Sequence, residues 1–510
     1  MTDISIVLNC HDEDEYIEAT LKSLDLCIQE AVRSDLSVEL ICVLDSATTK
    51  LAEKILNFKF NSLLLFKVVH VTNSSLGLSR NDGIKVCTGN FICTADADDL
   101  ISSNWLLSCF QTANKYFNRA KKHCIVVSEF IYSFGNVVSL QKYFPSKYFS
   151  PCDVIAYNPF SSRVFAHKTI FEKLLYRNLN KNSGFAYEDW DFNVRSYYLG
   201  IEFIIAPQTI LFYRRRDNSI MTQSDYVKLI PYSELYEPKV LIERATNYSR
   251  PNNFEMLAGS NVRHFAKSKF FMESLTQMKE IDPSVDLKNE TFTKNTDLVW
   301  HHYGYDLLNL FRKTEGLQFN YVIYLEESVS QQTINLIKKI INSNHNTFAS
   351  GKILLLSDHA TNIFESIFGK IPIVELNSFS KNLSKLTKDI FNTRALLSLV
   401  KNNGYLIVES EDSDYMRYYK KALLSRARIL VLPEFISQLE SNQPSFNSCD
   451  RENIEIWKLP IVSDEKTKYL IPYLVKKLSS IPTLYLILKR VYRSYYAQKL
   501  IRFLFKREFE

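Results

Sequence analysis

Residues 76–100 read LGLSRNDGIKVCTGNFICTADADDL, and this stretch contains the strongest indication of both fold and chemistry. The apolar run Asn90–Thr94 predicts a buried strand that leads directly into carboxylates at Asp96, Asp98 and Asp99. Side chains alternate along an extended segment, so Asp96 and Asp98 should point the same way. Two carboxylates on one side repel each other, and they stay ionised readily only when a cation lies between them.

Oxygen ligands of this kind favour Mg²⁺ or Mn²⁺, which keep one or two carboxylates and bind substrate phosphates as well. The preceding residues fit such a ligand, because Gly77 and Gly83 allow a close backbone approach and Arg80 is a permanently charged fork suited to a diphosphate. The same carboxylates also fit a solvated acidic turn in which Asp99 caps the next helix.

Further strands are predicted at Ile4–Leu8, Val38–Leu44 and Leu63–Val71, with helical stretches between them, including Glu15–Leu26. Strand–helix alternation predicts a parallel sheet covered by helices, and such sheets bind ligands beyond the carboxyl ends of their strands. Asp45 follows the second strand, where a short acceptor can contact a ribose or a base.

The segment GFAYEDWDF, residues 184–192, places Glu188 and Asp189 next to aromatic residues. Burial there would raise the pKa of one carboxyl, as a general base requires. The alternative is an exposed acidic start of a helix.

The segment LFYRRRDNSI, residues 211–220, has three consecutive arginines, Arg214–Arg216, after an apolar strand. Alternate arginines on a strand share a face and can hold phosphates. They also fit an exposed basic strand or salt bridges to Glu188 and Asp191.

Beyond a charged and mostly helical connector, 232–300, the alternation resumes and predicts a second α/β domain over 301–462. Its predicted strands are Tyr321–Leu325, Ile353–Leu356, Pro372–Leu376, Tyr405–Val408 and Ile429–Leu432. It contains neither GxGxxG nor a P-loop, so no ligand is predicted for it. Polar residues after these strands, Asp358, His359 and Glu409, are interpreted as helix caps.

The chain has 510 residues, 46% of them hydrophobic, which is too long for one compact core and predicts at least two domains. The net charge is +6, but the residues from Lys466 onward carry 11 Lys/Arg against 2 Asp/Glu. The body is therefore slightly acidic, which argues against a nucleic-acid binder. The tail, 463–510, predicts basic amphipathic helices that either contact an anionic membrane surface or dock on the body.

Eight of the nine cysteines lie between Cys10 and Cys152, and no CxxC pair occurs. They predict buried thiols in a reducing compartment rather than disulfides or a zinc site. The sequence has no signal-peptide pattern and no apolar run long enough for a spanning helix. We therefore expect a cytoplasmic protein, peripheral at the inner face of the cell membrane if the tail binds lipid.

The order of these segments resembles family 2 glycosyltransferases with the GT-A fold, over about residues 1–225. The closest match is SSLGLSRNDGIKVCTGNFICTADADDL, which looks like the arginine-containing helix start and the DxD motif of that family. SIVLNCHDEDEYIEATLKSL and VELICVLDSATT resemble the first two strands, GFAYEDWDFNVR the "ED" motif, and YRRRDNSI the strand that follows it.

The resemblance implies an N-terminal GT-A domain, Rossmann-like with a mostly parallel sheet, over 1–231. It implies an inverting transferase that uses a divalent cation, Mn or Mg. Asp189 would be the catalytic base with Glu188 beside it, and Asp98 would ligate the cation that bridges the two phosphates. The donor nucleotide would contact Asp45, Arg80, Asp96 and Arg214.

The family pattern is incomplete at the nucleoside end. Leu44 stands where the family usually has an Asp, Ser46 and Ala47 follow Asp45, Asn9 replaces a common Pro, and Asp12 a common Asn. A UDP-sugar donor is favoured, with GDP- and dTDP-sugars as alternatives. The implied acceptor is a glycan, lipid-linked acceptors included, in surface polysaccharide biosynthesis.

Two other functions stay open at this point. A nucleotidyltransferase could use the same sheet and carboxylates, but it typically has a Gly-rich loop with Lys or Arg after the first strand, and this chain has HDEDE there. A transferase-like scaffold without catalysis would fit the altered second-strand end.

Overall fold

The computed structural model describes residues 2–179, 184–216, 229–249, 262, 264–285, 302–325, 334–335, 337–338, 353–358, 372–380, 383–408 and 414–431. These residues belong to one compact unit, Met1–Gln443, and a second unit, Pro444–Glu510, lies outside the described residues. The predicted basic tail therefore also lies outside them, as do His359 and Glu409. None of the helices in the described part of the chain is long and apolar enough to cross a membrane.

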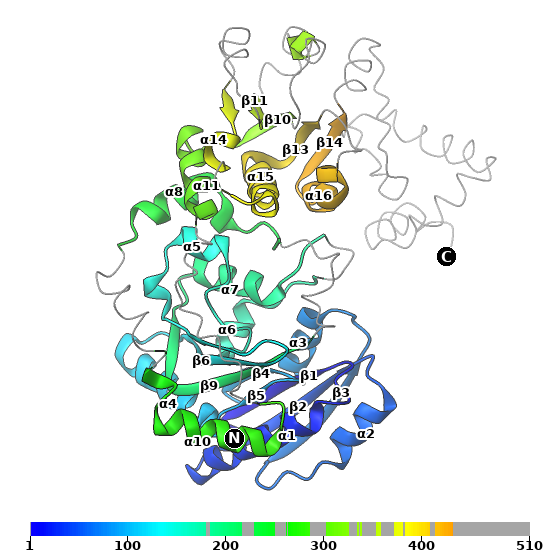
Figure 1. The fold of residues 1–510 in the computed structure, drawn as a ribbon, viewed down its shortest axis with the longest axis vertical. Coiled ribbons are helices and arrows are strands. Elements are labelled where there is room, and N and C mark those ends of the chain that lie inside the picture. The colour runs from blue at the N-terminus through cyan, green and yellow to red at the C-terminus, as the bar shows by residue number, and fades with distance from the viewer. Residues whose placement is uncertain are drawn as a thin grey trace, which may run out of the picture. The chain divides into compact units, whose positions relative to one another are not determined.

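The N-terminal part is built on a mixed sheet (Figure 1). Its described strands follow the order β3-β2-β1-β4-β8-β6-β9-β5, with β7 beside β6. Its strands are β1 Ile4–Cys10, β2 Val38–Asp45, β3 Leu65–Val71, β4 Phe91–Asp96, β5 Leu100–Ile101, β6 Ile125–Gly135, β7 Ser139–Lys142, β8 Phe165–His167 and β9 Phe203–Arg215. Strands β3, β2, β1 and β4 are mutually parallel. Strand β8 runs antiparallel to both β4 and β6, whereas β9 runs parallel to β6. The expectation of a mostly parallel α/β sheet is confirmed.

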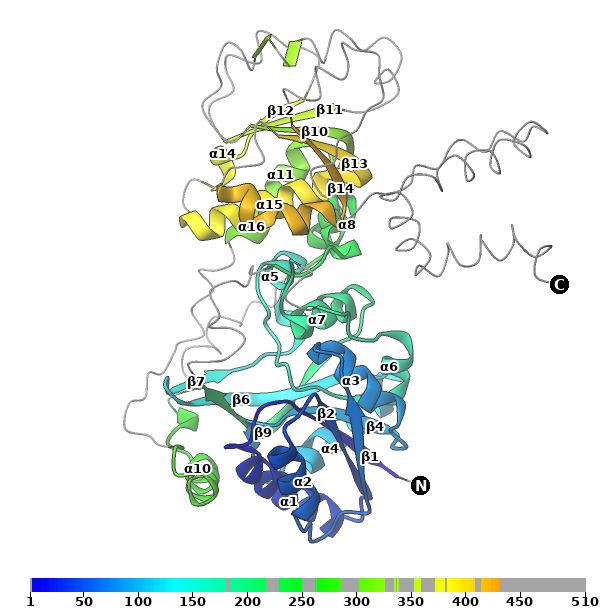
Figure 2. The same ribbon diagram turned by 90° about the vertical axis from the view of Figure 1, so that its right-hand side faces the viewer.

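Alternation along β1 explains why both faces of the sheet are covered. Ile6 and Leu8 belong to the apolar core that includes residues of α1, whereas Val7 belongs to the opposite core together with Ile84 of α3. The helices of this part are α1 Ile17–Arg33, α2 Thr49–Asn57, α3 Leu76–Lys85, α4 Trp105–Ala120, α5 Pro151–Ala156, α6 Lys168–Lys173 and α7 Glu188–Tyr198. Figure 2 shows α1, α2 and α4 on one side of the strands and α3, α6 and α7 on the other.

The second sheet has five described strands in the order β12-β11-β10-β13-β14, all parallel. They are β10 Phe319–Leu325, β11 Ile353–Ser357, β12 Ile373–Glu375, β13 Val400–Val408 and β14 Ala427–Val431. Each predicted strand of this half overlaps one of them. Counted along the chain the order is 3-2-1-4-5, so the chain reverses its winding direction between β10 and β13, as in other doubly wound domains.

The remaining helices are α8 Pro238–Thr246, α10 Lys269–Ile281, α11 His302–Lys313, α14 Asn377–Ser380, α15 Lys385–Leu399 and α16 Asp414–Leu424, with a 3₁₀ turn at Glu234–Tyr236. Helix α11 packs against α5 and α8. One apolar core contains Val7 of β1, Trp190 of α7 and Leu397 of α15. This core therefore joins the N-terminal part to the helices that cover the second sheet. The domain limits given above at 231, 300 and 462 stay predictions.

Candidate functional site

The acidic turn after β4 lies at the edge where the parallel strands of the first sheet end. Strand β4 ends at Asp96, and its last pair with β1 is Asn9 with Asp96. Strand β2 ends at Asp45, so the polar residues that follow β1, β2 and β4 share one edge. The edge predicted to bind a ligand therefore carries the acidic residues expected there.

Arg80 joins two of the predicted motifs directly. Its Nη2 donates to Asp96 Oδ1 at 2.9 Å, and its Nη1 donates to Glu188 Oε1 at 2.7 Å. The guanidinium is 1% exposed and stacks over the ring of Tyr176, whose centroid lies 5.2 Å away. One buried cation on α3 thus connects the end of β4 to the start of α7, and Arg80 lies 108 residues before its partner Glu188 in the chain.

Arg80 and its two carboxylate partners, Asp96 and Glu188, stabilise one another in their charged forms. Burial works against the charge of Arg80, but Asp96 and Glu188 outweigh it and raise the pKa of Arg80. Burial also opposes ionisation of Asp96, yet the guanidinium groups of Arg80 and Arg163 lower the pKa of that carboxyl. Asp96 is therefore ionised and held by the protein itself.

Asp98 has a different environment, in which acids outnumber cations. Arg216 Nε lies 3.2 Å from Asp98 Oδ2, and the same guanidinium reaches Glu13 at 3.6 Å and Asp12 at 3.7 Å. Burial raises the pKa of Asp98 although Arg216 opposes the shift. Burial together with the neighbouring charges of Asp98 and Asp12 raises the pKa of Glu13 to about 7.

Asp189 lies in the first turn of α7, next to the Glu188 that pairs with Arg80. The amide of Asn158 donates to Asp189 Oδ2 at 2.9 Å, and Asn158 is in turn held by Asn193, which donates to its Oδ1 at 3.0 Å. Burial and the charge of Glu188 raise the pKa of Asp189 to about 7. The carboxyl therefore has the proton affinity of a general base working near neutral pH.

The next residues of the same segment have structural contacts. Asp191 accepts bonds from Arg195 Nε at 2.9 Å and Arg177 Nη1 at 3.3 Å, and the indole of Trp190 donates to the carbonyl of Val154 at 2.9 Å. The alternative that Arg214–Arg216 pair with Glu188 and Asp191 does not match these contacts, since Arg80, Arg177 and Arg195 occupy those positions.

Asp45 holds the loop before α3. Its carboxylate accepts the backbone N–H of Asn73 at 2.8 Å, that of Ser74 at 3.2 Å, and the hydroxyl of Ser79 at 2.9 Å. The Asp45 side chain thus shapes the turn that presents Arg80. Its contact with a nucleoside stays a prediction.

Arg214 is buried and bound within the chain. Its Nε donates to the carbonyl of Asp98 at 2.9 Å, and its other nitrogens reach Asp282 and Ser284. Its backbone N–H donates to Asp99 at 3.0 Å. Arg214 therefore fixes the acidic turn from behind, while Arg216 faces the carboxylates. A direct nucleotide contact of Arg214 stays a prediction.

Sequence reasoning missed Glu13, Asn158 and Arg163, and from the arginine run 214–216 it selected Arg214 rather than Arg216 as the nucleotide contact. The cluster HDEDE after β1 and the arginine run after β9 were visible signals for Glu13 and Arg216. Arg163 is 2% exposed and lowers the pKa of Asp96, and its guanidinium nitrogens have no hydrogen-bond partner among the described residues. No local pattern marks Arg163 or Asn158.

The residues fit a divalent cation that is shared with a ligand. Among the residues described, no group of three or more His, Cys, Asp or Glu side chains could hold a metal ion alone. Asp98, however, is a carboxylate whose pKa is raised by burial although Arg216 and Arg214 oppose the shift, and Mg²⁺ or Mn²⁺ needs only one or two carboxylates when phosphates supply further oxygens. Asp98 would be the protein ligand in that arrangement.

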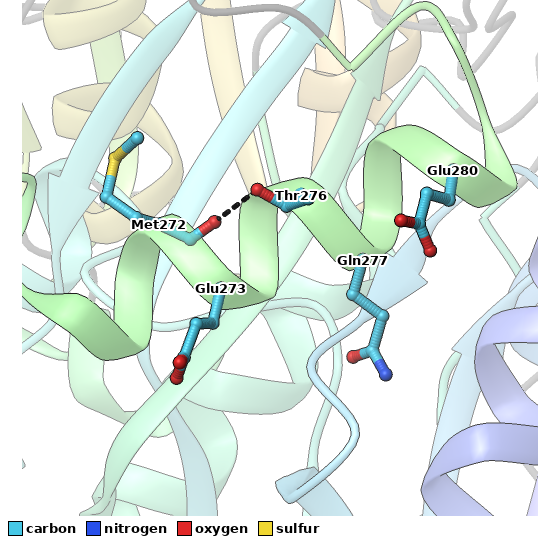
Figure 3. A pocket seen from close by; sticks show the side chains of 5 residues that line it. All are labelled: Met272, Glu273, Thr276, Gln277 and Glu280. Atoms are coloured by element: carbon cyan, nitrogen blue, oxygen red, sulfur yellow. Dashed lines mark hydrogen bonds between the residues drawn. The ribbon is translucent and has the colours of Figure 1, made fainter.

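A surface hollow elsewhere does not compete with this site. It is lined by Met272, Glu273, Thr276, Gln277 and Glu280, all on α10 (Figure 3). None of the carboxylates or arginines described above lines it, so we assign it no chemistry.

Comparison with known proteins identifies the first part of the chain. Residues 5–144 match the family model "Glycosyl transferase family 2". This segment is therefore similar to family 2 glycosyltransferases. This confirms the resemblance that the motifs indicated and the prediction of a glycosyltransferase, since the matched residues include β1, β2, β4 and the acidic turn. None of the curated proteins matches the chain.

Solved structures are similar at low identity. S. aureus TarS 1–349 in complex with UDP-GlcNAc is 16% identical, with 62% of this chain and 90% of that chain covered and a TM-score of 0.35. A mycobacterial protein is 14% identical, with 49% and 76% covered and a TM-score of 0.30.

Proposed function

We propose that the chain is a metal-dependent, inverting glycosyltransferase that moves a sugar from a nucleotide-sugar, with a UDP-sugar favoured, to a hydroxyl of a glycan or lipid-linked glycan. The single observation that carries this proposal is the bridge made by Arg80. It brings the turn with Asp98 and the helix start with Asp189 to one place, at the carboxyl edge of a family 2 sheet.

The two acids are suited to different tasks. Asp189, with a pKa of about 7, can take the proton of the acceptor hydroxyl while that oxygen attacks the anomeric carbon. The bond from the anomeric carbon to the nucleoside diphosphate breaks in the same step, and its electron pair leaves with the diphosphate. Because attack and departure occur on opposite faces, the configuration of the sugar inverts.

The leaving group acquires negative charge, which positive groups at the edge of the sheet would stabilise. A divalent cation on Asp98, when bound, would neutralise the diphosphate as the bond breaks. Arg216 lies 3.2 Å from the carboxylate of Asp98 and would contact the same phosphates. Glu188 is less suited to be the base, because Arg80 holds it as an ion pair at 2.7 Å.

Calorimetric titration tests the proposal on the full chain. UDP-, GDP- and dTDP-sugars are titrated with and without MnCl₂, and we expect one class to bind more tightly when the metal is present. Asp98→Ala should weaken that binding about tenfold or more, because the metal then loses its protein ligand, and should leave metal-free binding unchanged. Glu53→Ala, an exposed acid on α2, serves as the matched control.

Two results would contradict the proposal. If no sugar nucleotide binds in the presence of Mn²⁺, the site does not hold a donor. If turnover releases pyrophosphate rather than a nucleoside diphosphate, the enzyme transfers a nucleotidyl group instead.

The cellular setting is a separate part of the proposal. We propose a cytoplasmic enzyme of surface polysaccharide biosynthesis whose basic tail, from Lys466, contacts the inner face of the membrane. Co-sedimentation of the full chain with phosphatidylglycerol vesicles, but not with phosphatidylcholine vesicles, is expected. Equal sedimentation with both would remove the electrostatic basis of the idea.

A further inference from the structure

The backbone just before the proposed base has an unfavourable conformation. Tyr187 precedes α7 with φ 61° and ψ 64°, in the left-handed region that a residue with a side chain seldom adopts, and the helix has no side-chain cap. Such strain persists only where the surroundings hold it in place. The contacts that hold this segment therefore also set where Asp189 points.

One of these contacts comes from the segment that precedes the 3₁₀ turn. The N–H of Ala186 donates to the carbonyl of Leu229 at 2.8 Å. Phe185, Leu229 and Ile230 are buried in the same core as Trp190. Before Tyr187, Ala186 is thus held by the backbone of Leu229, and after it Trp190 is held by the hydrogen bond from its indole to the carbonyl of Val154.

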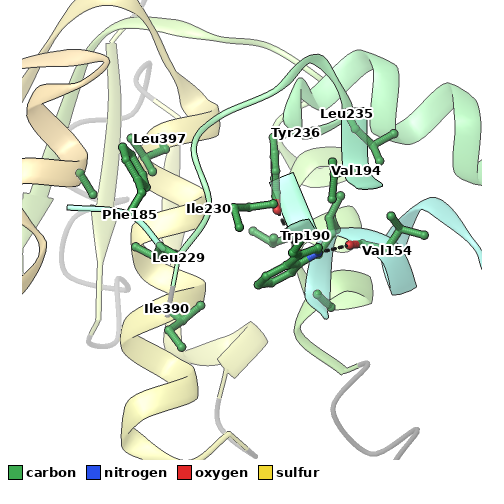
Figure 4. Close-up of a cluster of buried hydrophobic side chains, with 14 of the residues drawn as sticks. Val154, Phe185, Trp190, Val194, Leu229, Ile230, Leu235, Tyr236, Ile390 and Leu397 are labelled. Atoms are coloured by element: carbon green, nitrogen blue, oxygen red, sulfur yellow. Dashed lines mark hydrogen bonds between the residues drawn. The ribbon is translucent and has the colours of Figure 1, made fainter. Parts of the chain in front are cut away.

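The second α/β domain supplies the other wall of this core. Figure 4 shows Phe185 beside Leu397, and Ile230 between α15 and Trp190. Gly184, with φ 75°, approaches α16 so closely that a Cβ there would lie 2.8 Å from Lys421 Cβ and 3.0 Å from the backbone nitrogen of Ala422. The segment 184–187 therefore packs against two helices of the second domain.

Arg394 of α15 connects this wall to the backbone by a hydrogen bond. Its Nη1 donates to the carbonyl of Ile230 at 2.5 Å, and its guanidinium lies 4.4 Å from the centroid of the Tyr236 ring. The side chain is only 1% exposed. A buried charge held in this way fixes the 229–230 backbone more firmly than apolar packing alone, because losing its partner would be costly.

We propose that Arg394 is a positioning residue for the base Asp189, acting from the second α/β domain through the Ile230 carbonyl, the Leu229–Ala186 hydrogen bond and the strained turn at Tyr187. This assigns the second domain a part in the transfer reaction without a ligand of its own. The inference rests on the proposed function only in that Asp189 is taken as the base.

Hydrogen exchange of the full chain tests the structural part. Arg394→Met should raise amide exchange in the peptide 184–190 about tenfold, the effect expected for loss of one buried hydrogen bond. Arg426→Met is the matched control, since Arg426 also lies at this junction, 3.5 Å over the ring of Tyr232, but donates to Val400 and not to Ile230. Arg394→Lys, which keeps the charge and a donor, should restore much of the protection.

Kinetics test the functional part. With the donor found by titration, Arg394→Met should lower kcat at least tenfold while the Kd of the donor nucleotide changes less than twofold. Equal effects of Arg394→Met and Arg426→Met, or a loss of donor affinity in place of kcat, would overturn the inference. If no nucleotide binds at all, the proposed function fails, and the exchange experiment still decides whether Arg394 holds the segment.

Discussion

The two parallel sheets of this chain carry similar acids at similar places, yet these acids have different surroundings. Asp45 is the last residue of β2 and Asp358 follows β11, each the second strand of its sheet along the chain. Donors of the chain surround both: three N–H or O–H groups lie within 3.2 Å of Asp45, and Asn392 and Tyr324 donate to Asp358 at 3.1–3.3 Å. An acid after a strand is therefore no sign of chemistry when the fold already satisfies it.

The first sheet has further acids that its own cations do not balance. Asp98 and Glu13 share one guanidinium, that of Arg216, and burial raises the pKa of both carboxyls. At the second sheet, Lys388 lies 3.6 Å from Asp358 and offsets its charge. We therefore interpret buried carboxylates that share one cation at a strand end, rather than the presence of an aspartate, as the indication of a ligand site.

The strongest test of this comparison is Asp189→Asn. We expect the transfer rate to fall by about 10²–10⁴, the usual cost of removing a general base, because an amide cannot accept the acceptor's proton. The Kd of the donor nucleotide, measured by calorimetry, should stay the same. Asp358→Asn, the corresponding change at the second sheet, should leave the rate unchanged. A full rate in Asp189→Asn would place the base elsewhere.

The pH dependence of kcat/KM gives a second test of Asp189. Its pKa is raised to about 7, so the base is protonated and inactive at lower pH and ionised at higher pH. The rate should rise about tenfold per pH unit up to about pH 7 and then level off. A midpoint near 4, the value of a solvated carboxyl, would mean that the base lies outside this buried setting.

Much of the fold could be predicted because it follows local patterns. Apolar runs bounded by polar residues marked β1, β2, β4 and every strand of the second sheet. The carboxylates Asp96 and Asp98 could be assigned to a strand end for the same reason. Such patterns could not predict that β8 lies antiparallel between β4 and β6, because this depends on pairing between distant segments.

The parts of the site that could not be predicted depend on distant partners. Arg214 and Arg216 are two residues apart, so on a strand their side chains would share a face, and the alternation pattern cannot predict which of them contacts a ligand. Arg214 is buried because Asp282 and Ser284 lie behind it, and Arg216 is left to face Asp98. Asn158 orients Asp189 from a loop with no periodicity, so only the folded chain reveals it.

The free energy of unfolding tests whether Asp358 at the second sheet has a structural role. Asp358→Asn should lower the free energy of unfolding by about 1–3 kcal/mol, because an amide group would face the Asn392 donor and the charge opposite Lys388 would be lost. Urea denaturation of the full chain measures this. A variant with normal stability but impaired transfer would instead give Asp358 a part in the chemistry.

The smallest expected effect concerns Arg216, the guanidinium that pairs with the carboxylates at the edge of the first sheet. Arg216 is 23% exposed and lies within 3.7 Å of three carboxylates, so it competes with a divalent metal for them. Arg216→Gln should tighten Mn²⁺ binding without nucleotide about two- to fivefold, the value of a partly exposed ion pair, as measured by electron paramagnetic resonance of free Mn²⁺.

The same variant should weaken UDP binding by a similar factor, because the guanidinium that repels the metal attracts the diphosphate. Tighter Mn²⁺ binding together with weaker UDP binding would show that Arg216 acts locally on the carboxylates and the diphosphate, and not only through the net charge of the protein. Arg215→Gln removes a charge from the neighbouring exposed residue and should change neither constant. If Arg215→Gln and Arg216→Gln behave alike, Arg216 contributes only to the overall field, and the unbalanced charge at this edge belongs to the carboxylates alone.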